Sequence, residues 1–188
     1  MIRPMKPRMA GLTLLELVVV MALAAILVTI AVPNYTEFMT ENRMASEMNG
    51  FATSLMLARS EAIKRGQEVT VCASSNGTDC SDGPWSAGWI IYRNPQNASQ
   101  VPSASDLIRA HTGFSSSDTL TASTPFSTNQ SVSFTPLGIL VPSELTGGTF
   151  TLEDSPVQTY LTRCLALGPG GQPTAAEPGA PCTTTTRR

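Results

Sequence analysis

Histidine is almost absent from the sequence, which removes many common catalytic and metal-binding arrangements. The 188 residues include one histidine, His111. The four cysteines are not spaced like zinc ligands, and a single histidine does not complete such a set. We find no nucleophile beside a base, no phosphate-binding loop and no cluster of metal ligands. We therefore expect no cofactor, no metal and no enzymatic activity, and we interpret His111 as a loop or surface residue.

The sequence also lacks the excess of basic residues that is typical of nucleic-acid-binding domains. Its formal net charge is −2, and after Pro33 nine Lys or Arg stand against thirteen Asp or Glu, a net charge of −4. A surface of this sign repels phosphate groups. The other three basic residues, Arg3, Lys6 and Arg8, lie near the N-terminus.

An apolar run of 21 residues covers residues 12–32, and Glu16 is its only charged residue. A bilayer core about 30 Å thick needs about 20 helical residues, so residues 12–33 are predicted to be a transmembrane helix. Because the early basic residues precede the run, the positive-inside rule places the N-terminus in the cytoplasm and the following chain in the periplasm. An ordinary cleaved secretory signal is the alternative, but its apolar region is usually about 7–15 residues long.

A helical period continues through residues 34–65, which we expect to form an amphipathic periplasmic segment. Gly66 follows two basic residues and is a stop signal for this helix. Pro33 is expected to interrupt or kink the helix near the membrane boundary without preventing it. Apolar residues recur on one face at spacings of three and four: Met44, Met48, Phe51, Leu55, Ala58 and Ala62.

The remaining residues, 66–188, are predicted to form a β-rich domain. Clusters of Gly, Pro, Asn and Ser separate five runs of β-forming residues, at 68–73, 88–93, 131–135, 149–152 and 159–167. Residues 94–105, 115–129 and 169–181 are expected to be loops. The fold class is therefore α+β, with a long N-terminal helix packed on a C-terminal antiparallel β domain.

All four cysteines, Cys72, Cys80, Cys164 and Cys182, lie on the expected periplasmic side. Disulfides persist in that oxidising compartment. Four cysteines allow three connectivities, and proximity in the sequence favours Cys72–Cys80 and Cys164–Cys182.

Glu16 lies within the predicted transmembrane segment, where a charged side chain is energetically unfavourable. A carboxylate in a bilayer core costs about 2.5–3.5 kcal/mol on insertion scales, so such residues are usually paired or functional. The alternative is a tolerated charge near the cytoplasmic interface that reaches the lipid headgroups.

The segment Gly11-Leu12-Thr13-Leu14-Leu15-Glu16-Leu17 closely resembles the class III signal sequence of type IV pilins and type II secretion pseudopilins. In that family a prepilin peptidase cuts after the glycine and methylates the new N-terminus. The resemblance implies a leader at residues 1–11, cleavage between Gly11 and Leu12, and N-methylation of Leu12, where the family usually has Phe. It also implies an assembly role for Glu16, which would pair with the terminal amine of a neighbouring subunit. Pro33 matches the family as well.

Four further segments look like the minor-pilin class called GspH/FimT/FimU. In that class a β-rich, sandwich-like domain packs on the second half of the helix. Independently of the resemblance, we expect the aromatic residues Trp85, Trp89, Tyr92 and Phe134 to pack in the core. The segments are Ala58-Arg59-Ser60-Glu61-Ala62, Val69-Thr70-Val71-Cys72, Gly88-Trp89-Ile90-Ile91-Tyr92 and Phe134-Thr135-Pro136-Leu137-Gly138.

The resemblance implies a structural subunit, a minor pilin that initiates or caps a type IV pilus. The alternative is a minor pseudopilin H of a type II secretion system. The implied partners are other pilins, which join through a bundle of N-terminal helices, the prepilin peptidase and the inner-membrane assembly platform. The implied location is the inner membrane, crossed once with the C-terminal domain periplasmic, and then the tip of a pilus or pseudopilus.

Two other classes of function are less favoured. Some FimT-like proteins bind DNA through a Gly-Arg-x-Arg segment, but this chain has Gly171-Gln172-Pro173-Thr174 at that place. Only Arg187 and Arg188 remain near the C-terminus, and two charges attract phosphate weakly. A membrane-tethered periplasmic enzyme would need a catalytic constellation that we do not find.

Overall fold

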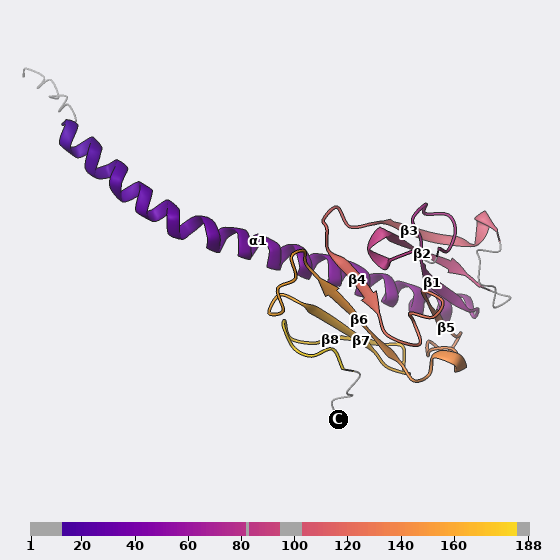
Figure 1. The fold of residues 1–188 in the computed structure, drawn as a ribbon. Helices are drawn as coiled ribbons and strands as arrows, with labels where there is room; N and C mark the ends of the chain where they lie inside the picture. Colours follow the sequence, from indigo (N-terminus) through magenta and orange to yellow (C-terminus); the bar gives the residue numbers. More distant parts are fainter. Residues whose placement is uncertain (1–12, 82, 95–102, 184–188) are drawn as a thin grey trace, which may run out of the picture. The chain divides into compact units, whose positions relative to one another are not determined.

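One long helix and eight strands form the part of the chain that the computed structural model describes, residues 13–81, 83–94 and 103–183. The helix, α1, is Leu14–Arg65, and the strands follow it in the sequence (Figure 1). The chain divides into two compact units between Thr40 and Glu41. We call the described residues from Glu41 onward the body.

The C-terminal end of α1 follows the predicted stop signal. Gly66 has a φ of +63°, which favours glycine, and its N–H donates to Ile63 O at 3.4 Å. The N–H of Gln67 donates to Ala62 O at 3.3 Å, which completes a Schellman cap. The assigned helix runs through Pro33 as one element, so the proline does not end it.

Among the described residues, no helix has both the length and the apolar character that crossing a membrane requires. The predicted transmembrane segment, residues 12–33, begins at Leu12, which lies outside the described residues.

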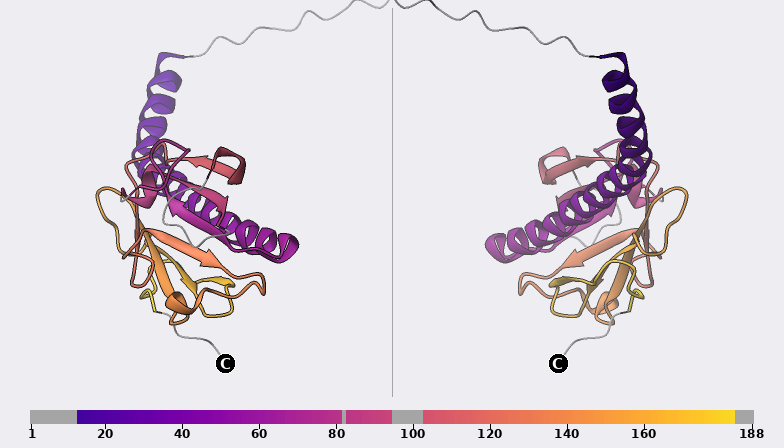
Figure 2. Two further views of the ribbon diagram at one scale, coloured as in Figure 1. Left: turned by 90° about the vertical axis from the view of Figure 1, so that its right-hand side faces the viewer. Right: turned by 90° about the vertical axis from the view of Figure 1, so that its left-hand side faces the viewer.

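Two four-stranded antiparallel sheets make up the β part of the body, and both lie beside the C-terminal part of α1 (Figures 1 and 2). Short 3-10 helices occur at Trp85–Ala87, Ala104–Asp106 and Pro142–Glu144. The first sheet has the order β3-β2-β1-β5, with β1 Val69–Ala73, β2 Gly88–Arg93, β3 Leu107–Thr112 and β5 Ser131–Phe134. The second has the order β4-β6-β7-β8, with β4 Thr119–Ala122, β6 Gly148–Glu153, β7 Arg163–Leu167 and β8 Pro173–Ala175.

The core confirms the predicted helical stripe and the predicted aromatic residues. All six stripe residues are at most 4% exposed, and Trp85, Trp89, Tyr92 and Phe134 are buried. The Phe51 ring lies 5.1 Å from that of Trp89, in the first sheet, and 4.7 Å from that of Phe150, in the second. One helical side chain therefore joins both sheets through edge-to-face contacts.

Three strands were not predicted, and one predicted strand was too long. β3 was missed, β4 lies within predicted loop 115–129, and β8 lies within predicted loop 169–181. Residues 159–162 precede β7 instead of belonging to it. The missed strands are short or mostly exposed edge strands, so they carry little of the buried periodicity that identifies a strand. His111 lies on β3 instead of in a loop; it is exposed and stacks on Trp89 at 4.1 Å.

Candidate assembly interface

The N-terminus of α1 is capped by its own sequence. The N–H of Glu16 donates to Thr13 Oγ1 at 3.2 Å, and the N–H of Leu17 donates to Thr13 O at 3.2 Å. Thr13 and Glu16 have the threonine-x-x-glutamate spacing of a capping box, and a carboxylate in the first turn suits the positive end of the helix dipole. Glu16 is exposed. Gly11 and Leu12, where cleavage and methylation are expected, lie outside the described residues.

Large apolar side chains of the first part of α1 are exposed over more than 20 residues. Each of them is at least 49% exposed, whereas single-chain proteins rarely show large continuous apolar surfaces unless a partner or a membrane covers them. They are Leu14, Leu15, Leu17, Val18, Val19, Val20, Met21, Leu23, Ile26, Leu27, Val28, Val32, Tyr35, Phe38 and Met39.

Thr29, a polar residue of this segment, is satisfied within the helix. Its hydroxyl donates to Ile26 O at 2.7 Å. Such internal bonding lets a polar side chain enter apolar surroundings without leaving an unpaired donor. The segment therefore suits either lipid or a bundle of apolar helices.

Two of the motifs that suggested the GspH/FimT/FimU class meet in the body. Arg59 lies on α1 and its Nε donates to Gly138 O at 2.7 Å, in the turn before Leu140. Gly138 has a φ of +75°, and a Cβ there would lie 2.6 Å from Ile63 Cδ1. Glycine thus allows both the backbone conformation and the close approach of the helix.

A second set of contacts joins α1 near residue 43 to the segment before β4, and sequence reasoning missed it. Arg43 Nε and Nη2 donate to Asp118 at 2.9 and 2.8 Å, and Asp118 is buried. The hydrogen bond to Asp118 is the main cause that raises the pKa of Arg43. Ser116 Oγ donates to Glu47 Oε1 at 3.0 Å. We call Arg43, Glu47, Ser116 and Asp118 the junction cluster. The two residues of α1 are 69 and 75 residues from their partners in the sequence, so no local pattern could have indicated the contacts.

Nearby, Arg163 Nη2 at the start of β7 lies 3.2 Å from Glu41 Oε1. Glu41 is half-exposed, so this pair contributes little by itself.

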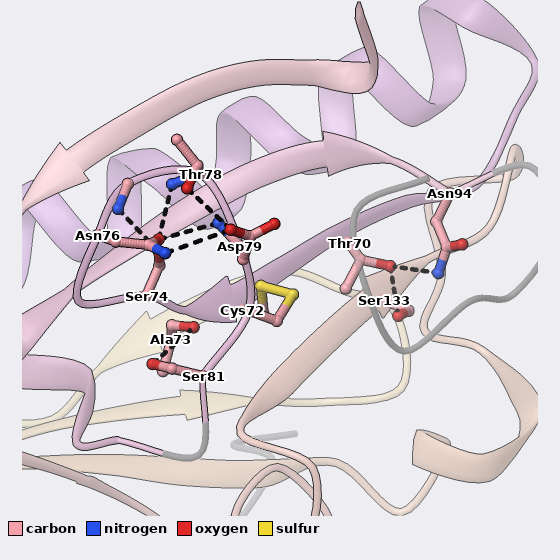
Figure 3. The surroundings of a disulfide bond; sticks show 12 residues. Thr70, Cys72, Ala73, Ser74, Asn76, Thr78, Asp79, Ser81, Asn94 and Ser133 are labelled. Carbon is pink, nitrogen blue, oxygen red and sulfur yellow. Dashed lines mark hydrogen bonds between the residues drawn. A yellow bond between two sulfur atoms is a disulfide. The ribbon is translucent and has the colours of Figure 1, made fainter. Parts of the chain in front are cut away.

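The four cysteines form Cys72–Cys80 and Cys164–Cys182, with Cα–Cα distances of 5.6 and 5.3 Å. This is the pairing that proximity in the sequence favours. The first bridge closes a loop in which Asn76 Oδ1 accepts the N–H groups of Thr78 and Asp79 at 2.9 and 3.0 Å (Figure 3). The second holds the segment after β8 against β7.

A buried polar network connects β1 and β5 beside the first bridge (Figure 3). The hydroxyls of Thr70 and Ser133 lie 2.8 Å apart, and Asn94 Nδ2 donates to Thr70 Oγ1 at 3.2 Å. The N–H of Ser133 donates to Glu144 Oε2 at 2.9 Å. Burial raises the pKa of Glu144 to about 7; the Ser133 bond opposes this shift and the charge of Glu68 adds to it.

This network has the properties of a structural element. Its groups bond one another between neighbouring strands, and the described ranges contain no group of three or more His, Cys, Asp or Glu side chains that could hold a metal ion.

Comparisons with known proteins agree with this architecture. Residues 47–171 match the family model described as type II transport protein GspH, and residues 6–32 match the prokaryotic N-terminal methylation motif. No curated protein matches the chain.

The fold is similar to crystal structures of the type IV minor pilin FimU from Pseudomonas aeruginosa strain PAO1. In one crystal form the TM-score is 0.59 at 22% identity, covering 79% of this chain and 99% of that one. In another the TM-score is 0.55 at 22% identity, covering 75% and 99%.

The motif and the family imply a membrane-anchored protein whose folded domain is extracellular or periplasmic. The family match spans well over half of the sequence and contains the last part of α1 and most of the strands. The chain therefore belongs to the GspH family, and it is a pilin-like protein of the class that comprises minor pilins and pseudopilins.

Proposed function

We propose that this protein is a minor pilin of a type IV pilus, a non-catalytic subunit that initiates or caps the filament. The observation that carries the proposal is the exposed apolar surface of residues 14–39 together with the methylation motif at residues 6–32. A helix whose large apolar side chains are exposed in the single chain serves as an anchor before assembly. In a bundle with other pilin helices, the same surface is removed from lipid and contacts protein.

In this proposal residues 1–11 are the leader, residues 12–33 the transmembrane and assembly helix, residues 34–65 its periplasmic half, and residues 66–188 the globular domain. Prepilin peptidase cuts between Gly11 and Leu12 and methylates Leu12. Cleavage creates an amine at Leu12, and Glu16 of a neighbouring subunit pairs with it in apolar surroundings, where opposite charges attract strongly. Pro33 lies at the end of the anchor.

The second candidate is a minor pseudopilin of a type II secretion system. The description of the matching family as a type II transport protein favours it. A gene deletion distinguishes the two. Loss of surface pili with normal protein secretion supports the pilus, and loss of secretion with normal pili supports the pseudopilus.

Substitution of Glu16 tests the assembly role. Glu16→Ala is expected to leave membrane insertion and leader cleavage intact, because removal of a carboxylate makes the anchor more apolar. Incorporation into filaments should fall at least about tenfold, since a neighbour's amine then enters the bundle unpaired. Glu16→Gln should be nearly as poor, because it keeps the shape of the side chain and loses the charge.

The measurement is the amount of each variant in sheared filaments relative to the inner membrane, with intact-mass analysis of the mature chain. The matched control is Glu177→Gln, an exposed glutamate of the body outside the apolar surface of residues 14–39, which should assemble normally. Wild-type incorporation of both Glu16 variants would remove the assembly role. A mature N-terminus other than N-methyl-Leu12 would contradict the processing proposal.

A further inference from the structure

Glu47 of the junction cluster has one carboxylate oxygen with no donor. Its Oε1 accepts from Ser116, while Oε2 is buried and has no hydrogen-bond partner among the described residues. The carboxyl group of Asp118, whose backbone N–H donates to the same Ser116 hydroxyl at 3.4 Å, also acts on the carboxyl group of Glu47. Two ionised carboxylates are both acceptors, so Glu47 and Asp118 can share a hydrogen bond only if one of them carries a proton.

The surrounding charges favour a proton on Glu47. Asp118 already accepts two hydrogen bonds from Arg43, so the ionised form of Asp118 is satisfied. Arg43 supplies one positive charge to two carboxyl groups. An ionised Glu47 would leave one negative charge without compensation in a partly buried site, which is costly.

Other charged groups near the cluster do not supply this missing charge. Asp154, after β6, is a further carboxyl group that acts on Arg43, and it accepts the N–H of Gln158. Arg163, from β7, is paired with Glu41 of α1. The described elements packed around Glu47 thus offer one guanidinium, that of Arg43, to both Glu47 and Asp118.

We propose that Glu47 keeps a proton in the folded protein and donates it to Asp118, so that the junction cluster is a pH-sensitive latch between α1 and the segment before β4. With the proton, the group of Arg43, Asp118 and Glu47 is neutral, and the buried Oε2 of Glu47 is a donor instead of an unpaired acceptor. Loss of the proton places two like charges side by side and weakens the contact.

The electrostatics of Glu47 point in the same direction. Burial is the largest cause that raises its pKa, and Asp118 adds to the shift, while the Ser116 bond and Arg43 oppose it. A carboxyl whose pKa is higher in the folded state binds its proton more tightly there. The stabilisation is therefore complete below the ordinary glutamate pKa and is lost as the pH rises through the folded value.

The test compares thermal unfolding of the full chain in detergent micelles between pH 5 and pH 8, for wild type and Glu47→Gln. Glutamine imitates the protonated acid, since its NH2 group donates to Asp118 and its carbonyl oxygen accepts from Ser116. We expect equal midpoints at pH 5 and a gain of about 2–4 °C for the variant at pH 8. Contributions of other carboxyl groups are common to both proteins and cancel in the difference.

A carboxyl-carbon NMR titration gives a second readout that does not depend on stability. The Glu47 resonance, assigned by its loss in Glu47→Gln, should titrate above the ordinary glutamate value of about 4.3. Asp118→Asn, where it folds, should lower that midpoint. The exposed Glu37→Gln should leave the pH dependence of unfolding unchanged. The proposal is overturned if Glu47→Gln retains the full wild-type pH dependence or if Glu47 titrates at or below the ordinary value.

Discussion

Residues 14–40 and residues 41–65 belong to one helix, α1, yet the two stretches differ in how their apolar side chains are used. In the first stretch large apolar residues such as Leu14 and Met21 are 81% and 67% exposed. In the second, Met44, Phe51 and Leu55 are fully buried by the sheets. Helix propensity does not distinguish the stretches; the presence of a covering sheet does.

This difference in burial shows which part of α1 stabilises the fold and which part is available to partners. Burial of a large apolar side chain stabilises a fold by roughly 1.5–3 kcal/mol, and only the second stretch gains this within the described chain. The first stretch keeps its apolar surface for a membrane or other helices, in agreement with the GspH family and the methylation motif.

The largest expected difference comes from one truncation in each stretch. Phe51→Ala should destabilise the body by about 3–5 kcal/mol, because it leaves a cavity among Trp85, Trp89 and Phe150. Met21→Ala should change the free energy of unfolding by no more than about 0.5 kcal/mol, because Met21 is 67% exposed. Denaturant unfolding followed by tryptophan fluorescence measures both, since both tryptophans contact Phe51.

Equal changes in the free energy of unfolding for the two truncations would contradict the proposed difference between the stretches. Destabilisation of the body by Met21→Ala would mean that the first stretch takes part in the fold. A small effect of Phe51→Ala would mean that the core closes around the missing ring, and Leu55→Ala then provides an independent test in the same buried stripe.

The sequence was informative where periodicity or local signals were strong. The stripe from Met44 to Ala62 and the stop at Gly66 follow from spacing and from one glycine, and both are confirmed. Edge strands β4 and β8 were missed, because short exposed strands lack a buried alternation and β8 begins with a proline. Proline is tolerated there because β8 is the last strand of its sheet.

Contacts between distant residues could not be predicted from the chain alone. Nothing near Arg43 indicates Asp118, and nothing near Arg59 indicates the carbonyl of Gly138. These contacts exist because two sheets bring their loops to the two ends of the same helical segment. The motifs that contain Arg59 and Gly138 resemble those of the family and so indicated the class. They did not indicate that the two residues are in contact.

Removal of either disulfide is expected to reduce the free energy of unfolding by less than Phe51→Ala does. The double variant Cys164→Ser, Cys182→Ser opens a bridge between residues 18 apart and should cost roughly 3 kcal/mol by increasing the entropy of the unfolded chain. The pair Cys72→Ser, Cys80→Ser opens a bridge between residues 8 apart and should cost slightly less. Denaturant midpoints of the oxidised wild type and both variants measure these costs, and neither change should affect the exposed stretch of α1. A larger loss from the shorter loop would show that local packing at β1 outweighs chain entropy.

The smallest expected change in the free energy of unfolding concerns a buried glutamate, which we compare with an exposed one in the first stretch of α1. Glu16 is exposed in the first turn of α1, whereas Glu144 is buried against β5 and burial raises its pKa to about 7. Because the folded protein binds this proton more tightly than the unfolded chain, the stabilisation is complete below about pH 4.5 and is lost as the pH rises to about 7. The shift corresponds to at most about 3 kcal/mol, and we expect about 2 kcal/mol after local relaxation.

Glu144→Gln should remove this part of the pH dependence while keeping an acceptor for the N–H of Ser133. At pH 8 the variant should therefore be more stable than the wild type, and at pH 4.5 the two should be equal. The matched control is Glu177→Gln, an exposed glutamate of the body that should follow the wild type at every pH. Thermal unfolding between pH 4.5 and pH 8 makes the measurement. If the difference in stability between Glu144→Gln and the wild type were the same at pH 4.5 and pH 8, folding would not change the proton affinity of Glu144, and Glu144 would titrate like an exposed glutamate instead of a buried acid.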